Sequence, residues 1–210
     1  MDFAGEFETH LTVALPQEGD VDSLRAWGAV RGLKCTRIVL ARGSSVSQPM
    51  LTREGRGVLS EELTKAKAIA AELADAGFRV ARIKIEASPF NRDVPLSDAD
   101  GQAQPPGRYF EHHVKLLLDG SSDIEHVTAI ARDHAAHVSR NALRTRDDGR
   151  TERFVTQRCH RVGRETAGRM LQDLLRALRA SGHDILESES EFVVYDDKLA
   201  LDDGWLEDKV

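Results

Sequence analysis

The sequence predicts an α+β fold built from two similar halves, and three observations carry this prediction. The chain of 210 residues is long enough for two small domains of about a hundred residues each. Its halves align with each other, so that Glu8 falls on Glu111 and Gly77 falls on Gly182. The apolar patterning then gives the same order of strands and helices in each half. We therefore expect an internal duplication.

Each element of the first half follows from a local signal. Residues 7–15 alternate apolar and polar side chains, as a half-buried strand does. Asp20 or Asp22 can cap the next helix, and Ser60 with the acidic residues after it opens a second helix that Gly77 ends. The expected elements are a strand at 7–15, a helix near 21–31, a hairpin of strands Thr36–Arg42 and Pro49–Arg53, a helix at 60–76 and a strand at about 78–86.

The second half repeats this order. Its expected elements are a strand at 109–118, a helix at 123–135, a hairpin of strands 138–146 and 152–159, a helix at 164–181 and a strand at 183–194. Two βαββαβ units with antiparallel sheets are typical of the ferredoxin-like arrangement. Four of the six prolines lie between Pro89 and Pro106, which indicates a connection between the units. The predicted domains are a first repeat at 1–86, a linker at 87–108, a second repeat at 109–195 and an acidic tail at 196–210, with Trp205 as a packing anchor.

Composition excludes several classes of protein. No apolar run approaches the roughly 20 residues of a membrane span, and the acidic start of the chain is unlike a signal peptide. Two cysteines, Cys35 and Cys159, are too few for a disulfide framework or a cysteine-based zinc site. These features favour a cytoplasmic protein without a membrane partner. The net charge of −6 argues against a general nucleic-acid binder.

The open faces of the two predicted sheets carry matching polar residues. Helices would cover one face of each sheet, which leaves Glu8, His10 and Thr12 on the open face of the first strand. The aligned strand of the second half presents Glu111, His113 and Lys115, and the last strands add Arg82, Lys84, Glu86, Glu187, Glu189 and Glu191. Water-facing sheet faces are ordinarily polar. If the two faces pack together, however, both histidines line one cleft on a pseudo-twofold axis, where paired groups that titrate near neutral pH suit acid–base chemistry.

The segment His10-Leu11-Thr12-Val13 resembles the His-x-Thr-hydrophobic tetrad of the 2H phosphoesterases, a superfamily of two-lobed cyclic phosphodiesterases that carry the tetrad once per lobe. The resemblance implies that His10 and His113 act as base and acid on a small nucleotide-like phosphoester, without a metal. Lys115 stands where that family has Thr or Ser, and lysine can bind phosphate as a point charge. The residues expected to hold this phosphorylated or anionic ligand are Thr12, Lys115, Thr52, Thr156 and Arg158.

A second resemblance gives a different site. The segment His112-His113-Val114-Lys115-Leu116-Leu117 looks like the opening strand of vicinal-oxygen-chelate proteins, which also fold by duplication. That resemblance implies one divalent transition metal held by His10, Glu86, His113 and Glu191, a ligand set that suits iron, zinc, nickel or manganese. The family uses βαβββ units with one helix each, whereas two long helices are expected here, at 60–76 and 164–181.

A third hypothesis is a protein without catalytic activity. Paired ferredoxin-like units also serve as modules for ligand binding or dimerisation. Exposed sheet faces and edges favour a homodimer. Arginines between Arg140 and Arg179 could hold a phosphorylated ligand on the second hairpin, at Arg144, Arg146, Arg153 and Arg158. The glycine-rich segment 53–57 is expected to be a plain loop, since it lacks the spacing of a phosphate-binding loop.

Overall fold

The computed structural model describes residues 2–16, 20–43, 45–118, 121–141 and 150–204 of the chain. The first half contains β1 (Ala4–Ala14), α1 (Asp20–Ala29), β2 (Lys34–Leu40), β3 (Ser47–Val58), α2 (Leu59–Asp75) and β4 (Arg79–Ala87). After α3 (Asp98–Gln102), the second half contains β5 (Tyr109–Leu118), α4 (Ser121–Asp133), β6 (Ala136–Asn141), β7 (Thr151–His160), α5 (Arg164–Ala180) and β8 (Asp184–Asp196). The order βαββαβ therefore occurs twice, as the sequence predicts.

The strands form one closed barrel rather than two separate sheets. Around the barrel they follow the order β1-β3-β2-β6-β7-β5-β8-β4, and all neighbouring pairs are antiparallel. Within each half the first strand lies between the third and the fourth, so that His10 faces Thr52 on β3 and His113 faces Thr156 on β7. The halves join where β2 pairs with β6 and β4 pairs with β8.

The closed barrel removes one reason to expect a dimer. The strands that would be the edges of two separate sheets, β2, β4, β6 and β8, pair with one another in the described part of the chain. Their backbone hydrogen-bonding groups are thereby used within the molecule. The exposed sheet edges on which we expected a homodimer are therefore not present among these residues, and the dimer stays a prediction without that support.

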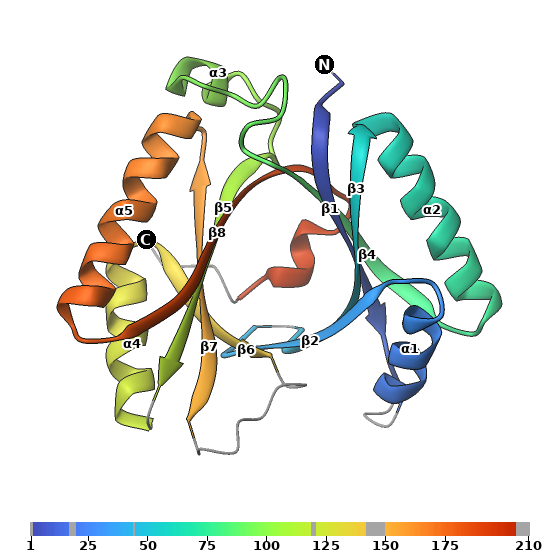
Figure 1. Cartoon of the computed structure of the whole chain (residues 1–210), viewed down its shortest axis with the longest axis horizontal. Coiled ribbons are helices and arrows are strands. Elements are labelled where there is room, and N and C mark those ends of the chain that lie inside the picture. Colours follow the sequence, from blue (N-terminus) through green and yellow to red (C-terminus); the bar gives the residue numbers. More distant parts are fainter. Residues whose placement is uncertain (1, 17–19, 44, 119–120, 142–149, 205–210) are drawn as a thin grey trace.

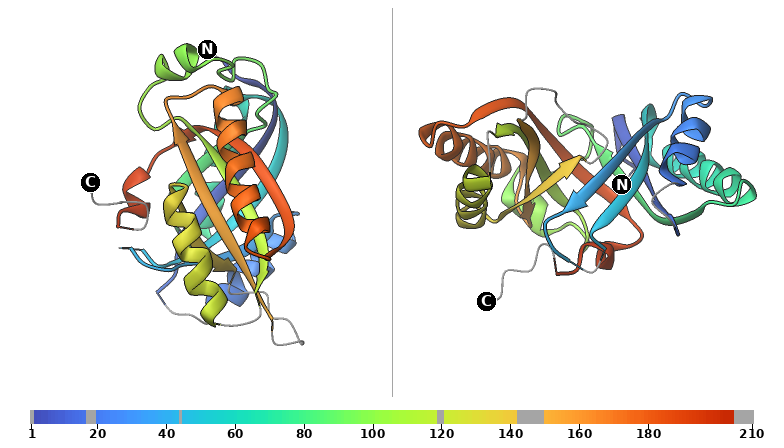
Figure 2. Two further views of the ribbon diagram at one scale, coloured as in Figure 1. Left: turned by 90° about the vertical axis from the view of Figure 1, so that its left-hand side faces the viewer. Right: turned by 90° about the horizontal axis from the view of Figure 1, so that it is seen from below.

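The long helices cover the outside of the barrel on two opposite flanks, with α1 and α2 on one flank and α4 and α5 on the other (Figures 1 and 2). Alternation along the strands explains this arrangement. Leu11 on β1 packs under α1 and α2 together with Leu24 and Leu73, and Val114 on β5 packs under the other helix pair. Since neighbouring residues face opposite ways, His10 and the residues in phase with it point into the barrel.

The glycine-rich segment at 53–57 is a strand, so the prediction of a loop was wrong. It forms the second half of β3, where Gly55 pairs with Phe7 of β1. The buried carboxylate of Glu62, from the first turns of α2, lies directly over Gly55, and a Cβ at that position would collide with it. Glu62 forms ion pairs there with Arg53 and Lys65. The glycine thus makes room for an ion pair between strand and helix.

The connection between the halves contains a helix that the sequence analysis missed. Ser97 caps α3 in a reciprocal capping box with Asp100, whose carboxylate accepts the backbone N–H of Ser97. The acidic tail contains a short 3-10 turn, η1 (Leu199–Asp202), which lies across one end of the barrel (Figures 1 and 2). Trp205 lies outside the described residues. Within the described ranges, no helix combines the length and apolarity needed to cross a membrane.

Candidate functional site

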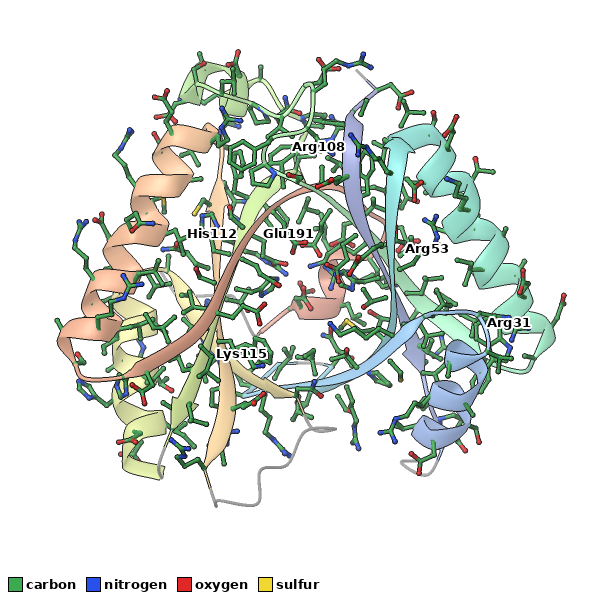
Figure 3. The ribbon with its side chains drawn as sticks, in the orientation of Figure 1. Arg31, Arg53, Arg108, His112, Lys115 and Glu191 are labelled. Atoms are coloured by element: carbon green, nitrogen blue, oxygen red, sulfur yellow. The ribbon has the colours of Figure 1, made fainter. Side chains whose placement is uncertain are left out.

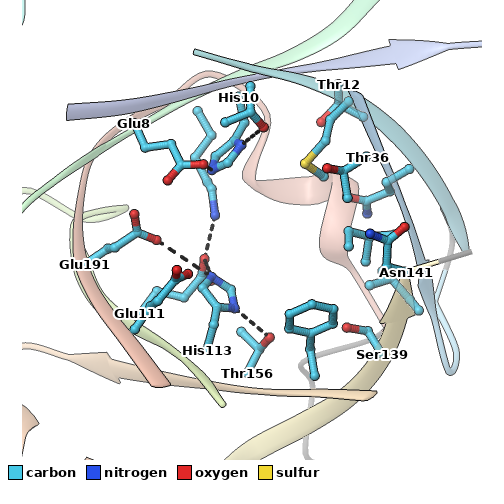
Figure 4. A pocket seen from close by; sticks show the side chains of 18 of the residues that line it. Glu8, His10, Thr12, Thr36, Glu111, His113, Ser139, Asn141, Thr156 and Glu191 are labelled. Carbon is cyan, nitrogen blue, oxygen red and sulfur yellow. Dashed lines mark hydrogen bonds and ion pairs between the residues drawn. The ribbon is translucent and has the colours of Figure 1, made fainter. Parts of the chain in front are cut away.

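The barrel contains a cavity of about 230 Å³ whose lining is mostly polar. One side carries the predicted open-face residues of β1, β4, β5 and β8. The other side mixes polar residues of β2, β3, β6 and β7 with an apolar patch formed by Ile38, Leu40, Met50 and Phe154. The two open sheet faces therefore pack toward each other, as we expected, and both His10 and His113 line the space between them (Figure 4).

The two histidines have the same surroundings. His10 Nδ1 lies 2.9 Å from Thr52 Oγ1, and His113 Nδ1 lies 3.1 Å from Thr156 Oγ1. Each threonine stands directly opposite its histidine on the neighbouring strand. These hydroxyls hold the rings so that both Nε2 atoms face the centre of the barrel. This arrangement resembles the way outer partners orient metal-binding histidines.

Carboxylates surround both Nε2 atoms. His10 Nε2 lies 2.8 Å from Glu86 Oε2, and His113 Nε2 lies 3.3 Å from Glu111 Oε2 and 4.0 Å from Glu191 Oε2. One ligand atom from each of Glu86, His113 and Glu191 lies within 4.8 Å of the other two. Figure 4 shows Glu111, His113 and Glu191 converging from β5 and β8, and Figure 3 places Glu191 inside the barrel. We call His10, Glu86, His113 and Glu191 the His/Glu cluster.

Buried cations neutralise two carboxylates, Glu86 of this cluster and Glu111 beside it. Lys84 Nζ lies 2.9 Å from Glu86 and 2.5 Å from Glu111, and Arg158 Nε lies 2.5 Å from Glu111. Burial works to raise the pKa of Glu111, but Lys84 and Arg158 hold it well below its ordinary value. Burial likewise opposes the charge of Glu86, and Lys84 and His10 lower its pKa. Both groups are therefore carboxylates at neutral pH.

Glu191 differs from these two. Its closest ion-pair partner among the described residues is His113, at 4.0 Å. Burial, followed by the charges of Glu86 and Glu8, raises the pKa of Glu191 well above its ordinary value. The pKa of His113 is also raised, because the attraction of Glu111 outweighs the cost of burying the charged ring. The cluster thus contains a carboxyl group whose charge lacks a close cation.

The tail contributes a further charged group that sequence reasoning did not find. Asp202 of η1 is buried in the cavity and bonds to Arg82, Arg158 and Gln48. Arg82 also forms an ion pair with Asp196. No local pattern marks Asp202, since it is one of several acids in an acidic tail. Arg82 and Lys84 were recognised as open-face residues, and only their neighbours in space show that they belong to the site.

The residues predicted to hold phosphate all line this cavity, yet most already have partners. Thr52 and Thr156 bond to the histidines, and Lys115 Nζ lies 3.1 Å from Glu152. Arg158 bonds to Glu111 and Asp202, and Thr12 is buried on β1. Of the four residues in the predicted metal set, Glu86, His113 and Glu191 each have a ligand atom within 4.8 Å of the other two, and His10 joins them only through its contact with Glu86. Figure 3 shows Lys115 on the cavity side of β5.

Three other features do not add to this site. Cys159 is buried and His160 is exposed, since adjacent strand residues face opposite ways, as expected. His112, next to His113, points outward beneath α5, where its Nε2 lies 3.0 Å from the carbonyl of Ala167 (Figure 3). Arg144 and Arg146 of the second hairpin lie outside the described residues.

Comparisons with known proteins give no family. No family model and no curated protein match the chain. Among solved structures, the small subunit of acetolactate synthase from Thermotoga maritima is 12% identical, with a TM-score of 0.33 over 90% of this chain and 94% of that one. A mutant chlorite dismutase from Candidatus Nitrospira defluvii is 11% identical, with a TM-score of 0.31 over 91% of this chain and 92% of that one.

Proposed function

We propose that Glu86, His113 and Glu191 of the His/Glu cluster bind one divalent transition-metal ion and that the protein is a metal-dependent enzyme acting on a small molecule in the barrel cavity. One observation carries this proposal. Three atoms no more than 4.8 Å apart always have a point within about 2.8 Å of all of them, and zinc binds nitrogen and carboxylate oxygen at about 2.0–2.2 Å. Side-chain movements of less than about 1 Å would complete such a site.

The charges also favour a cation over a phosphate. Glu86 and Glu111 are already paired with Lys84 and Arg158. A phosphate bound between the two histidine Nε2 atoms would lie close to Glu191, whose carboxyl group has no close cation among the described residues. A divalent cation bound there would instead give the Glu191 carboxylate the close positive partner that it lacks among the described residues. Imidazole and carboxylate together are ligands typical of zinc, iron, manganese and nickel.

In this function the metal would act as a Lewis acid on an oxygen of the substrate. The chain's own residues supply the rest. Thr52 and Thr156 hold the two imidazoles, and Lys84 fixes the buried carboxylate of Glu86. His10 lies within reach of the same cavity and can accept or donate a proton there. The volume of about 230 Å³ limits the space to a small molecule, and Ile38, Leu40, Met50 and Phe154 offer it an apolar contact.

The vicinal-oxygen-chelate resemblance contributes the choice of ligands and no more. Each half of this chain has two long helices, in the order βαββαβ, where that family has one helix in each βαβββ unit. The proposal therefore depends on the geometry of the cluster. We also propose that the two halves arose by duplication, because the matching histidine–threonine pairs occupy equivalent places in them.

Elemental analysis of the untagged protein, purified without added metal or chelator, tests the metal site. We expect close to one transition-metal ion per chain in the wild type and a large loss in Glu191→Gln. Glu187→Gln is the matched control, because Glu187 lines the same cavity from the same strand but lies outside the cluster. Metal-free wild-type protein that takes up none of zinc, iron, manganese or nickel in equilibrium dialysis would overturn the proposal.

The phosphodiesterase remains the second candidate, favoured by the two matched histidines in one cavity. It requires no metal, so a screen of cyclic phosphodiesters in strong chelator separates the two functions. Hydrolysis that persists in chelator and is lost in both His10→Ala and His113→Ala would establish the phosphodiesterase. Under the metal proposal, we expect no turnover in chelator.

A further inference from the structure

The carboxylate of Asp202 is bound as a ligand would be. Its Oδ2 accepts hydrogen bonds from Arg82 Nη1 at 3.0 Å and Arg158 Nη2 at 2.7 Å. Its Oδ1 accepts one from Gln48 Nε2 at 3.0 Å. Two guanidinium groups and one amide thus converge on a single carboxylate at one end of the cavity. Arginines in this arrangement are the usual receptors for carboxylates in proteins.

The three donors are held in place by other partners. Arg82 Nε lies 3.0 Å from Asp196, and Arg158 Nε lies 2.5 Å from Glu111. The amide nitrogen of Gln48 also contacts the carbonyl of Ser45 at 3.3 Å. Each arginine is therefore fixed through one part of its guanidinium group and presents another nitrogen to the cavity. A binding site whose donors are preorganised loses little entropy when a ligand arrives.

Among the described residues, the hydrogen bonds between η1 and the barrel wall come from the side chain of Asp202. The backbone hydrogen bonds of the turn are local, from Leu201 to Lys198 and from Asp203 to Ala200. Just before the turn, the backbone N–H of Asp197 donates to the carbonyl of Ile83, and the Asp197 carboxylate accepts the N–H of Ile83. Another carboxylate could therefore replace the bonds of Asp202 while the start of the turn stays attached to β4.

A buried hydroxyl group lies on the residue that packs against one of these arginines. Tyr109 is 1% exposed, and its hydroxyl has no hydrogen-bond partner among the described residues. Its ring lies 4.8 Å from the guanidinium carbon of Arg158. Buried hydroxyl groups usually have a partner, and a water molecule or a ligand oxygen beside Arg158 would supply one for Tyr109.

We infer that Arg82, Arg158 and Gln48 form a subsite for the carboxylate of a small organic acid, which Asp202 fills until such a ligand displaces it. This inference rests on the proposed function and deepens it, because the subsite opens on the cavity that holds the His/Glu cluster. It gives the substrate class as a small carboxylate with an apolar body, which the wall containing Met50 and Phe154 would contact. Removing Asp202 leaves the guanidinium groups with one anion fewer, and a carboxylate from solution restores the balance.

Acetate is the probe that tests the subsite, in Asp202→Ala protein kept in chelator. We expect Asp202→Ala to have a lower Tm than the wild type and acetate to restore it in a saturable way, while chloride at equal ionic strength does not. Half-maximal stabilisation should need at least tenfold less acetate in Asp202→Ala than in the wild type. Asp203→Ala is the matched control, since Asp203 is the exposed neighbour. It should behave like the wild type.

Asp202→Asn keeps the shape of the side chain and covers the case in which Asp202→Ala does not fold. Isothermal titration should show acetate binding to Asp202→Asn at least tenfold more tightly than to the wild type. Folded variants that respond to acetate no more than to chloride would make Asp202 a fixed structural contact and overturn the inference. Stabilisation by phosphate without stabilisation by acetate would also overturn it. Because these titrations contain chelator, their failure is separate from failure of the metal site.

Discussion

Removing Glu191 should remove most of the thermal stabilisation that a divalent metal gives the protein. A ligand present at 100 times its Kd stabilises the folded state by about 2.7 kcal/mol. For a chain of this size, each kcal/mol raises Tm by about 2–4 °C, so saturating zinc should raise Tm by about 5–11 °C. Mutating a residue that only hydrogen-bonds to a metal ligand lowers metal affinity by about 10–100-fold. Losing one of the three ligands themselves should therefore lower zinc affinity by at least about 100-fold.

At the same free zinc concentration, Glu191→Gln would then retain about 0.4 kcal/mol of stabilisation, or a shift of about 1–2 °C. In chelator its Tm should equal or exceed that of the wild type, because burial and the charges of Glu86 and Glu8 disfavour the Glu191 carboxylate. The assay is a thermal unfolding series in zinc, manganese and nickel, with Glu187→Gln as the control. The reasoning would be refuted if zinc did not raise the Tm of the wild type. It would also be refuted if Glu191→Gln and Glu187→Gln lost the same part of that Tm increase.

The remaining predictions concern groups around the site and beneath the helices. Thr156→Val removes the hydroxyl at His113 Nδ1, and we expect metal affinity in a competition titration to fall by about 10–100-fold while the fold is kept. Burial lowers the pKa of His112 to about 4, so the stability that its neutral ring contributes is present above its unfolded pKa of about 6.5 and is lost as the pH falls through its folded pKa. The loss is about 3 kcal/mol, and urea unfolding of His112→Gln should show a correspondingly flatter pH dependence; an unchanged slope would contradict it. Burial opposes the charge of Glu62, yet Lys65 and Arg53 lower the pKa of this carboxyl group. The stability that the Glu62 carboxylate contributes is therefore present above its unfolded pKa and is lost as the pH falls through its folded pKa. Glu62→Gln should therefore destabilise the protein by about 1–3 kcal/mol at pH 7 and by less in acid, and equal losses at both pH values would exclude this origin.

Most of the fold follows from local patterns that the sequence shows directly. Alternation in residues 7–15 and 109–118 places His10 and His113 on the face away from the helices, and the cavity confirms that placement. Gly77 and Gly182, both with positive φ, follow the two long helices as expected. The segment at 53–57 was misread, because glycine ordinarily marks a turn. Here Gly55 instead leaves room for the carboxylate of Glu62 in a continuous strand.

The candidate site could be predicted in part. The aligned pairs Glu8 with Glu111 and Glu86 with Glu191 mark the acids that meet the histidines, and strand pairing then brings them close. Asp202 could not be found this way, because its partners Arg82 and Arg158 are 120 and 44 residues away in the chain. Such a contact depends on where the tail re-enters the barrel. No periodic pattern encodes that path.

The sequence by itself determined the strands, the helices, their repeated order and the inward face that carries the histidines, since these depend on side-chain periodicity over a few residues. Tertiary structure decided three things: the closure of two sheets into one barrel, the distances within the His/Glu cluster, and the position of Asp202 between Arg82, Arg158 and Gln48. Each depends on pairing between strands or segments that are far apart in the chain. The charge balance that favours a cation at Glu191 and a carboxylate at Arg82 arises only when those segments meet in a cavity that limits their contact with water.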